Sequence, residues 1–265
     1  GVNMEILKFT IKGSNAFFKK PDVNTYLYLT YGNIHKIALI GILGAILGYC
    51  GYNKNKLNYM INKKELKNVS ENDFPEFYDK LINLKVAIVP KSEYGNFPKK
   101  IQTFNNSVGY ASKEQGGNLI VKEQWLENPK WDIYIIIDNK QAKVIADYIL
   151  NKKAVYIPYL GKNDHFADIF DSEMFEENQI EKLYDTKRIS GLFMKKDFSV
   201  LMEEEDDEEE VEYEELYKYE EKLPIRINKQ TNMYELESFI CTNMNVANIS
   251  NQTIYKVGKE NIVFY

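Results

Sequence analysis

Cysteine and histidine are both scarce in this sequence, with two residues of each among 265. Cys50 and Cys241 are too few for a disulfide framework, and no C-x-x-C spacing is present to hold a metal. His165 has no second histidine three or four residues away, so a zinc signature is missing. The GxSxG, Walker A and GxGxxG patterns are absent as well. We therefore expect no metal site and no cofactor.

Long hydrophobic runs are also lacking. The longest, 37–51, is shorter than the ~20 residues that span a bilayer, and glycines interrupt it. No signal peptide opens the chain, and the residues before Met4 resemble a cloning remnant. The hydrophobic fraction of 44% is ordinary for a globular protein with a real core. These features predict a cytoplasmic protein that does not associate with a membrane.

Charge is unevenly distributed along the chain. The segment 203–221 holds 13 acidic residues and one lysine, a net charge of −12, so the remainder carries +7 although the whole chain carries −5. Residues 1–130 alone hold 18 lysines against 11 acids. A basic surface favours a polyanionic partner. The acidic segment itself is typical of a solvated loop, with docking on a basic neighbour or mimicry of nucleic acid as alternatives.

The apolar pattern predicts an α+β fold. Residues 5–11 alternate with a period of two, as a half-buried strand does. Further strands are expected at 84–89, 131–137 and 154–157, and helices at 37–51 and, after Asp138 as N-cap, at 139–151. Alternating segments at 101–106 and 119–126 predict a hairpin inserted between the second and third strands. This order is the split βαβ of the ferredoxin-like or RRM-like architecture, βαββαβ.

Two units are expected along the chain. Residues 4–160 would form an RRM-like palm that includes a thumb hairpin, 97–128, and residues 161–265 would form a smaller, mostly β subdomain. Strands of the second unit are expected near 223–228, 233–240, 252–257 and 261–265. In the helix at 37–51, Gly41, Gly44, Ala45 and Gly48 share one face, which indicates tight packing or a ligand at that face.

Lysines and aromatic residues lie together in several predicted loops, and unpaired RNA suits this combination because bases stack on rings while ammonium groups neutralise phosphates. The loop at 12–20 provides Lys12, Gly13, Phe17, Phe18, Lys19 and Lys20. The hairpin provides Lys99, Lys100, Gln102, Asn105, Asn106, Tyr110, Lys113, Lys122 and Trp125. The structural alternative is that the aromatic residues pack in the core and the lysines are solvated.

His35 and Lys36 stand at the start of the glycine-rich helix, where free N–H groups suit a phosphate. A lone histidine before a helix is more often a turn or cap residue, and no acid or base partner is identifiable nearby. We take both residues as candidate phosphate contacts. Lys162, in the turn after the expected fourth strand, is a further candidate for RNA or a neighbouring subunit.

Four segments together resemble one family. They are GSNAFFKKP (13–21), HKIALIGILGAILGY (35–49), KEQWLENPKWDIYIII (122–137) and VYIPYLGKNDHFADI (155–169), and they occur in family order. The chain resembles the Cas-five family of the RAMP superfamily over about the first 170 residues. The C-terminal half is similar only loosely, and its details most resemble type I-B members. The acidic segment resembles an insertion.

The resemblance implies a function in antiviral defence. It implies a non-catalytic subunit of a type I Cascade that caps the 5′ handle of the crRNA and contacts the backbone subunits and the large subunit. The alternative from the enzyme class is a metal-independent endoribonuclease as in type I-C, where the family member itself cuts with a Tyr/Lys/His set. The predicted hairpin contains no histidine, which counts against cutting. A scaffold that contacts only protein is a second alternative.

Overall fold

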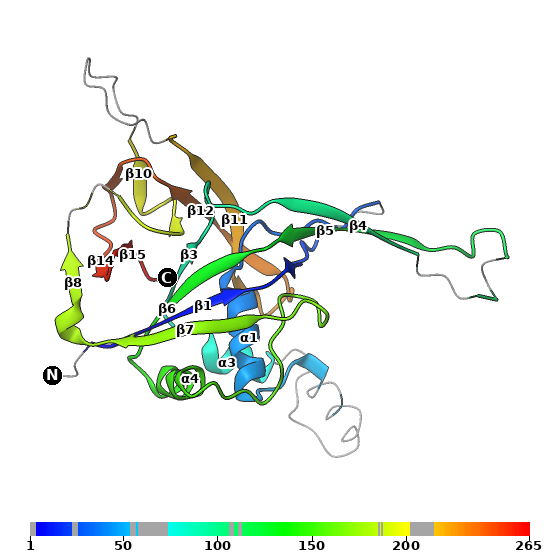
Figure 1. Cartoon of the computed structure of the whole chain (residues 1–265), viewed down its shortest axis with the longest axis horizontal. Helices are drawn as coiled ribbons and strands as arrows, with labels where there is room; N and C mark the ends of the chain where they lie inside the picture. The colour runs from blue at the N-terminus through cyan, green and yellow to red at the C-terminus, as the bar shows by residue number, and fades with distance from the viewer. Residues whose placement is uncertain are drawn as a thin grey trace.

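The computed structural model describes residues 4–22, 26–53, 57, 74–105, 109–110, 113–184, 186, 188–201 and 215–265. Antiparallel sheets dominate and helices are few, which confirms the expected α+β class. Figure 1 shows a central sheet with helices on one side, a group of small sheets beside it, and one long hairpin that projects from the body.

The central sheet has four strands, β1 (Ile6–Lys12), β3 (Val86–Pro90), β6 (Lys130–Ile136) and β7 (Asp168–Phe175). Their order is β3-β6-β1-β7, and every neighbouring pair is antiparallel. Leu7, Phe9 and Ile11 of β1 are fully buried on the face that meets the helices, as their alternation predicted. The expected strands at 5–11, 84–89 and 131–137 are therefore confirmed.

The fourth strand is not at 154–157, and that prediction was wrong. Residues 155–157 are exposed, and the backbone N–H groups of Val155 and Tyr156 donate to Ile46 O and Ala45 O at the end of the first helix. This apolar segment therefore satisfies the last carbonyls of a helix, which lack partners inside it. The edge of the sheet is instead formed by β7, which lies beyond residue 160.

Within the described residues, the sheet is flanked by the helices α1 (Lys36–Leu47), α3 (Glu76–Leu81) and α4 (Lys140–Leu150). Helix α1 ends at Gly48, which is left-handed with φ of 77°. The N-cap of α4 is Asn139, whose side chain accepts from Ala142 N at 3.0 Å, and not Asp138 as expected. Asp138 instead pairs with Lys85 Nζ at 2.8 Å. On the small face of α1, a side chain at Gly44 would meet Phe77 at 2.5 Å, so close packing with α3 requires glycine there.

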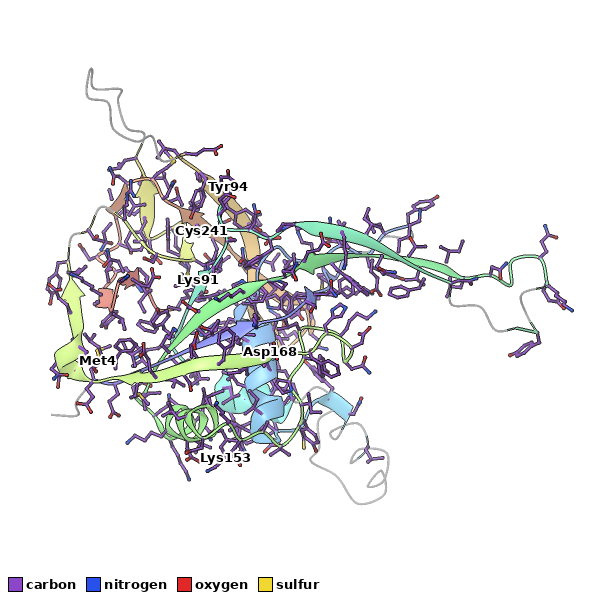
Figure 2. The ribbon with its side chains drawn as sticks, viewed as in Figure 1. Met4, Lys91, Tyr94, Lys153, Asp168 and Cys241 are labelled. Atoms are coloured by element: carbon purple, nitrogen blue, oxygen red, sulfur yellow. The ribbon has the colours of Figure 1, made fainter. Side chains whose placement is uncertain are left out.

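The inserted hairpin is present as β4 (Lys99–Asn105) and β5 (Ile120–Glu127), close to the expected strands. At its base, β2 (Asn15–Ala16) pairs with β5, which gives a three-stranded sheet in the order β2-β5-β4. The side chains of its outer part stand clear of the body (Figure 2). The hairpin therefore leaves the central sheet free to form without it.

The second half of the chain is mostly β. Its elements are η1 (Glu177–Gln179), β8 (Ile180–Leu183), β9 (Phe193–Met194), β10 (Phe198–Val200), β11 (Lys218–Ile227), β12 (Tyr234–Thr242), β13 (Val246–Asn248), β14 (Ile254–Val257) and β15 (Glu260–Ile262). They form the sheets β11-β12-β9, β15-β14-β8 and β10-β13. Leu223, Phe239 and Cys241 belong to the same buried cluster as Leu7 and Phe9, so the two halves share a core.

The acidic segment 203–221 is not a solvated loop at its C-terminal end. Residues 202–214 lie outside the described residues, but Lys218–Glu221 begin β11, and Glu221 pairs with Phe239 of β12. A deletion of 203–221 would therefore remove part of a strand.

Both histidines are buried, and we expect the protein to lose stability as pH falls from 7 to 5. Burial lowers the pKa of His35 to about 3 and lowers the pKa of His165 as well. His35 is therefore neutral when folded and takes up a proton only when unfolded, once the pH falls below its ordinary value near 6.5, while His165 is protonated less readily in the folded than in the unfolded state. The loss from His35 is about 1.4 kcal/mol per pH unit, roughly 2 kcal/mol at pH 5. Urea denaturation across this pH range measures it.

The variant His35→Asn is the matched control. His35 Nδ1 accepts from Ala38 N at 3.2 Å as the N-cap of α1, and asparagine is a good N-cap that does not titrate. We expect the variant to fold and to show a clearly shallower dependence on pH, with the remainder due to His165. An unchanged slope in His35→Asn would contradict this assignment.

Candidate nucleic-acid interface

The hairpin has one face that turns toward the body of the protein. The register pairs Lys100 with Trp125 and Gln102 with Glu123, so these side chains share that face with Phe104. Trp125 is 7% exposed and lies edge-on against His165, with ring centroids 4.3 Å apart. Trp125 therefore anchors the hairpin base and is not available for stacking with a base.

The side chain of Lys162, in the turn that follows α4, contacts this inward face of the hairpin. Its Nζ lies 2.8 Å from Glu123 Oε2, 4.9 Å from the ring centroid of Phe104 and 5.3 Å from that of Trp125. Trp125 Nε1 donates to the same Glu123 oxygen at 2.8 Å. The charge of Lys162 is thus matched inside the chain, and the residue fixes the hairpin more than it offers a phosphate contact.

The turn that carries Lys162 lies directly against the loop at 12–20. Phe17 N donates to Leu160 O at 3.0 Å, and Gly161 has φ of +85° with no room for a side chain against Phe17 O. Gly13 is also confined, because an added Cβ would lie 2.6 Å from Leu160 Cδ1. These glycines permit a close backbone approach.

The two phenylalanines of this loop are core residues, as the structural alternative predicted. Phe17 and Phe18 are 5% and 4% exposed, and the ring of Phe18 lies 5.9 Å from that of Trp131. Contrary to the RNA contact that the sequence had suggested, Phe17 and Phe18 therefore pack in the core and are not available to stack on RNA bases. The lysines of the loop lie over rings: Lys12 Nζ is 4.9 Å from the Phe170 centroid, and Lys19 Nζ is 3.8 Å from the Tyr28 centroid.

His35 and Lys36 do not present a free helix N-terminus. His35 is 4% exposed and caps the helix, as described above. Lys36 Nζ donates to Tyr265 O at 3.1 Å, and burial, followed by the nearby Arg226, lowers the pKa of Lys36 to about 8. Both residues therefore stabilise the interior, and the expected phosphate contact at this point is not supported.

The outward face of the hairpin carries the exposed candidates. Lys99, Asn105 and Lys122 lie on this face, and the register places Lys122 opposite Thr103. Tyr110 and Lys113 are exposed toward the tip, Gln102 is half-buried on the opposite face, and Asn106 lies outside the described residues. Lys100 Nζ lies 3.7 Å from Glu127 Oε1. The structure therefore divides the predicted set into a buried group at the hairpin base and an exposed group on the hairpin.

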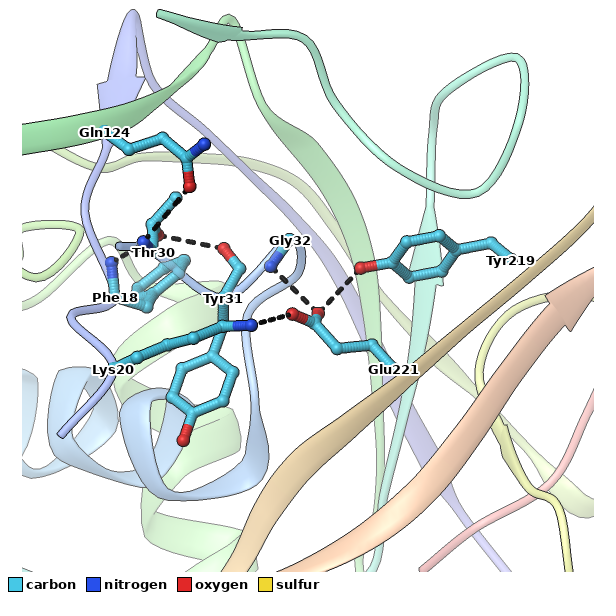
Figure 3. Close-up of polar contacts among 8 residues, drawn as sticks. All are labelled: Phe18, Lys20, Thr30, Tyr31, Gly32, Gln124, Tyr219 and Glu221. Atoms are coloured by element: carbon cyan, nitrogen blue, oxygen red, sulfur yellow. Dashed lines mark hydrogen bonds and ion pairs between the residues drawn. The ribbon is translucent and has the colours of Figure 1, made fainter. Parts of the chain in front are cut away.

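Sequence reasoning missed the polar contacts that hold the loop at 26–32 (Figure 3). Glu221 Oε2 accepts from Gly32 N at 2.9 Å and from Tyr219 Oη at 2.7 Å, while Oε1 pairs with Lys20 Nζ at 3.1 Å. Burial, followed by the charge of Glu221, raises the pKa of Tyr219, so its hydroxyl stays protonated as a donor. Within the acidic run, nothing in the sequence distinguishes Glu221 from its neighbours.

The other side of this loop contacts the hairpin. Gln124 Oε1 accepts from Thr30 N at 3.5 Å, and Thr30 Oγ1 accepts from Phe18 N at 3.0 Å (Figure 3). Tyr28 N donates to Lys122 O, and Gln124 N donates to Tyr28 O, both at 2.9 Å. The loop is thus held between β5 and β11, and it fixes the position of the hairpin relative to the body.

Within the described ranges, no group of three or more His, Cys, Asp or Glu side chains is placed to hold a metal ion. Nor does any helix in those ranges combine the length and the apolar character that a membrane span needs.

No protein-family model matches the chain, and no curated protein matches it significantly. Among solved structures, it is similar to a chain of a CRISPR RNA-guided surveillance complex, with 12% identity, a TM-score of 0.44 and 92% of both chains covered. It is similar to a CRISPR protein from Archaeoglobus fulgidus, with 8% identity, a TM-score of 0.42 and 98% of both covered. A third is a chain of the type III-B Cmr-beta complex bound to cognate target RNA and AMPPnP, with 13% identity, a TM-score of 0.38, and 90% of this chain and 85% of that one covered. Because similarities this low do not establish a shared function, function has to be argued from the residues.

We expect Glu221→Ala to destabilise the protein by about 3 kcal/mol, because Gly32 N and Tyr219 Oη would lose a charged acceptor at a site where the Glu221 side chain is 11% exposed. Glu220→Ala is the matched control, since Glu220 is adjacent, exposed, and paired only with Lys195 and Lys218 at the surface. The control should cost less than about 1 kcal/mol. If urea denaturation shows the same loss of unfolding free energy in both variants, Glu221 contributes no more to stability than its neighbour Glu220.

Proposed function

We propose that this chain is a non-catalytic RNA-binding subunit of a type I CRISPR complex, and that its hairpin β4–β5 binds the 5′ handle of the crRNA. The four family-like segments support this assignment. The sheet order β3-β6-β1-β7, with α1 and α4 as crossover helices, supports a ferredoxin-like palm, and the position of the hairpin supports a role as its thumb.

The observation that carries the proposal is the charge left exposed on the hairpin. Lys99, Lys113 and Lys122 form no ion pair with any residue that the structure describes, whereas Glu123 and Glu127 are each matched by a lysine. Glu114 is the remaining acid between 97 and 128. The outward surface is therefore positive, and a positive ribbon that carries amide and tyrosine side chains suits a single strand of RNA.

Apolar side chains on the same hairpin support a protein neighbour as well. Ile101 and Ile120 are each 61% exposed, and Leu119 is 57% exposed. A two-stranded ribbon has little core of its own and gains stability from a partner. This supports the proposal that the hairpin also contacts a backbone subunit of the complex, with the large subunit as a further neighbour.

The endoribonuclease alternative is not favoured by the position of the histidines. General acid–base chemistry needs a group that reaches the substrate and titrates near the working pH. His35 is occupied as a helix cap, and burial lowers the pKa values of both His35 and His165.

We expect the pure protein to bind repeat RNA in EDTA without cutting it, because neither histidine reaches solvent as a general acid or base. Denaturing electrophoresis of end-labelled RNA measures the outcome. Specific cleavage that a single substitution abolishes would favour the endoribonuclease. If the protein binds no RNA even at low salt, a scaffold that contacts only protein would be favoured.

The triple variant Lys99→Ala, Lys113→Ala, Lys122→Ala should weaken RNA binding, since each lost phosphate contact flattens the slope of log affinity against log salt by ~0.7. A salt titration monitored by fluorescence anisotropy measures this slope, and circular dichroism confirms folding. The control variant replaces Lys195, Lys196 and Lys218, which are paired with Glu220 or Glu237 on the other subdomain. If the triple variant and its control share the parental slope, RNA binding by the hairpin is refuted.

A further inference from the structure

A cavity of about 490 Å³ lies between helix α1 and the segment that follows α4. It is lined by Phe18, Ala38, Gly41, Ile42, Ala45, Tyr49, Gly51, Phe77, Tyr156, Tyr159 and Gly161. Among these described residues none has a charged side chain, and five of the eleven are aromatic. The volume is within the range of about 300–1,000 Å³ that is typical of small-ligand sites.

The floor of the cavity is the small-residue face of α1. Ala38, Gly41 and Ala45 lie at i, i+3 and i+7, so they share one side of the helix. A side chain at Gly41 would meet Phe77 only at 3.9 Å, in contrast to Gly44, where the same ring leaves no room. Close packing therefore accounts for Gly44 but not for Gly41, which leaves space above the helix.

The walls are flat aromatic rings. The ring of Tyr49 is held in place, because its hydroxyl donates to Gln141 Oε1 at 2.6 Å and Lys80 Nζ lies 4.2 Å from its centroid. Tyr156 and Tyr159 are 61% and 43% exposed. Neither hydroxyl makes a hydrogen bond with another described residue, so both can pair with a ligand. Rings with free hydroxyls, over a floor of small residues, suit a planar heterocycle.

The cavity lies close to the hairpin base, through residues that neighbour its lining in the sequence. Gly161 lines it, and the next residue, Lys162, contacts Glu123 and Phe104 of the hairpin. Phe18 also lines it and is followed by Lys19, whose ammonium group is exposed above Tyr28, and Tyr28 is hydrogen-bonded to β5. A strand of RNA that leaves the hairpin base would therefore pass the exposed Lys19 and then reach an uncharged aromatic cavity.

We propose that this cavity receives one unstacked base of the RNA strand bound by the hairpin. The inference rests on the proposed RNA-binding function and adds a specific position to it. An extruded base would stack on one tyrosine ring and pair its edge with the hydroxyl of another, while its phosphate stays near Lys19 outside the cavity. A peptide strand fits less well, because the lining offers rings and hydroxyls at one point and no exposed row of backbone donors.

The test fills the cavity without altering the hairpin. Ala45→Leu adds a branched side chain to the floor and suits the helix, because leucine and alanine have similar helix propensity. The probe is a short single-stranded oligouridylate or oligoadenylate, in which one nucleotide at a time is made abasic. For the parent, we expect one position where the abasic site weakens binding about tenfold, the effect of losing one stacked base. For Ala45→Leu, we expect overall binding to weaken similarly and the sensitivity at that position to disappear.

A second pair of variants covers the case in which Ala45→Leu does not fold. Tyr156→Ala changes an exposed ring at the cavity, and Tyr184→Ala changes a ring that is also exposed, 83% against 61%, and is not part of the lining. Only Tyr156→Ala should lose the position-specific sensitivity.

The outcomes separate the two proposals. If parental binding depends on the hairpin lysines but no abasic position matters, or if Tyr156→Ala retains the sensitivity, the cavity does not hold a base and the RNA-binding proposal survives. If the parent binds no RNA, both proposals fail together.

Discussion

The close contact between the turn at Gly161 and the backbone of Phe17 fixes the position of most of the candidate nucleic-acid interface, namely the hairpin base and the cavity beside it. Gly161 has a left-handed conformation, and a side chain there would collide with Phe17 O. Because the two segments touch, residues 155–159 are held across the end of α1, and Lys162 reaches the inward face of the hairpin. Both the cavity and the hairpin base therefore depend on one close approach that only glycine permits.

Acidic side chains have two distinct functions in this chain. Glu123 and Glu221 are partly buried, and each pairs with a lysine that the sequence offered as an RNA contact. Such pairs orient the lysines and remove their charge from the surface. Lys99 and Lys122, which form no ion pair with any described residue, both lie on the outward face of the hairpin. Ion pairs within the chain thus determine which of the lysines keep an unmatched positive charge at the surface.

The elements that could be predicted are those with regular periodicity, such as β1, α1 and the hairpin. The edge strand β7 was missed because its register shifts opposite Lys8 and Thr10 and Asp171 has a positive φ, so its apolar residues do not alternate. The segment at 154–157 has the composition of a strand, but it meets a helix end where no sheet edge is available. For the site, composition located the lysine-rich segments correctly. It could not identify the partners Glu123 and Glu221, which are distant in sequence from Lys162 and Lys20.

The number of paired strands changes along the length of the hairpin. Near the body, β5 has neighbours on both edges, since β4 lies on one side and β2 and Tyr28 on the other. From Lys122 outward, β4 and β5 form a ribbon of two strands. Bending stiffness rises with the number of paired strands, so flexure should concentrate just beyond Lys122 while the base keeps its orientation. The hairpin thus has a stiff base and a more pliable outer part. The outer part can adjust to a neighbour without disturbing the sheet at the base that supports it.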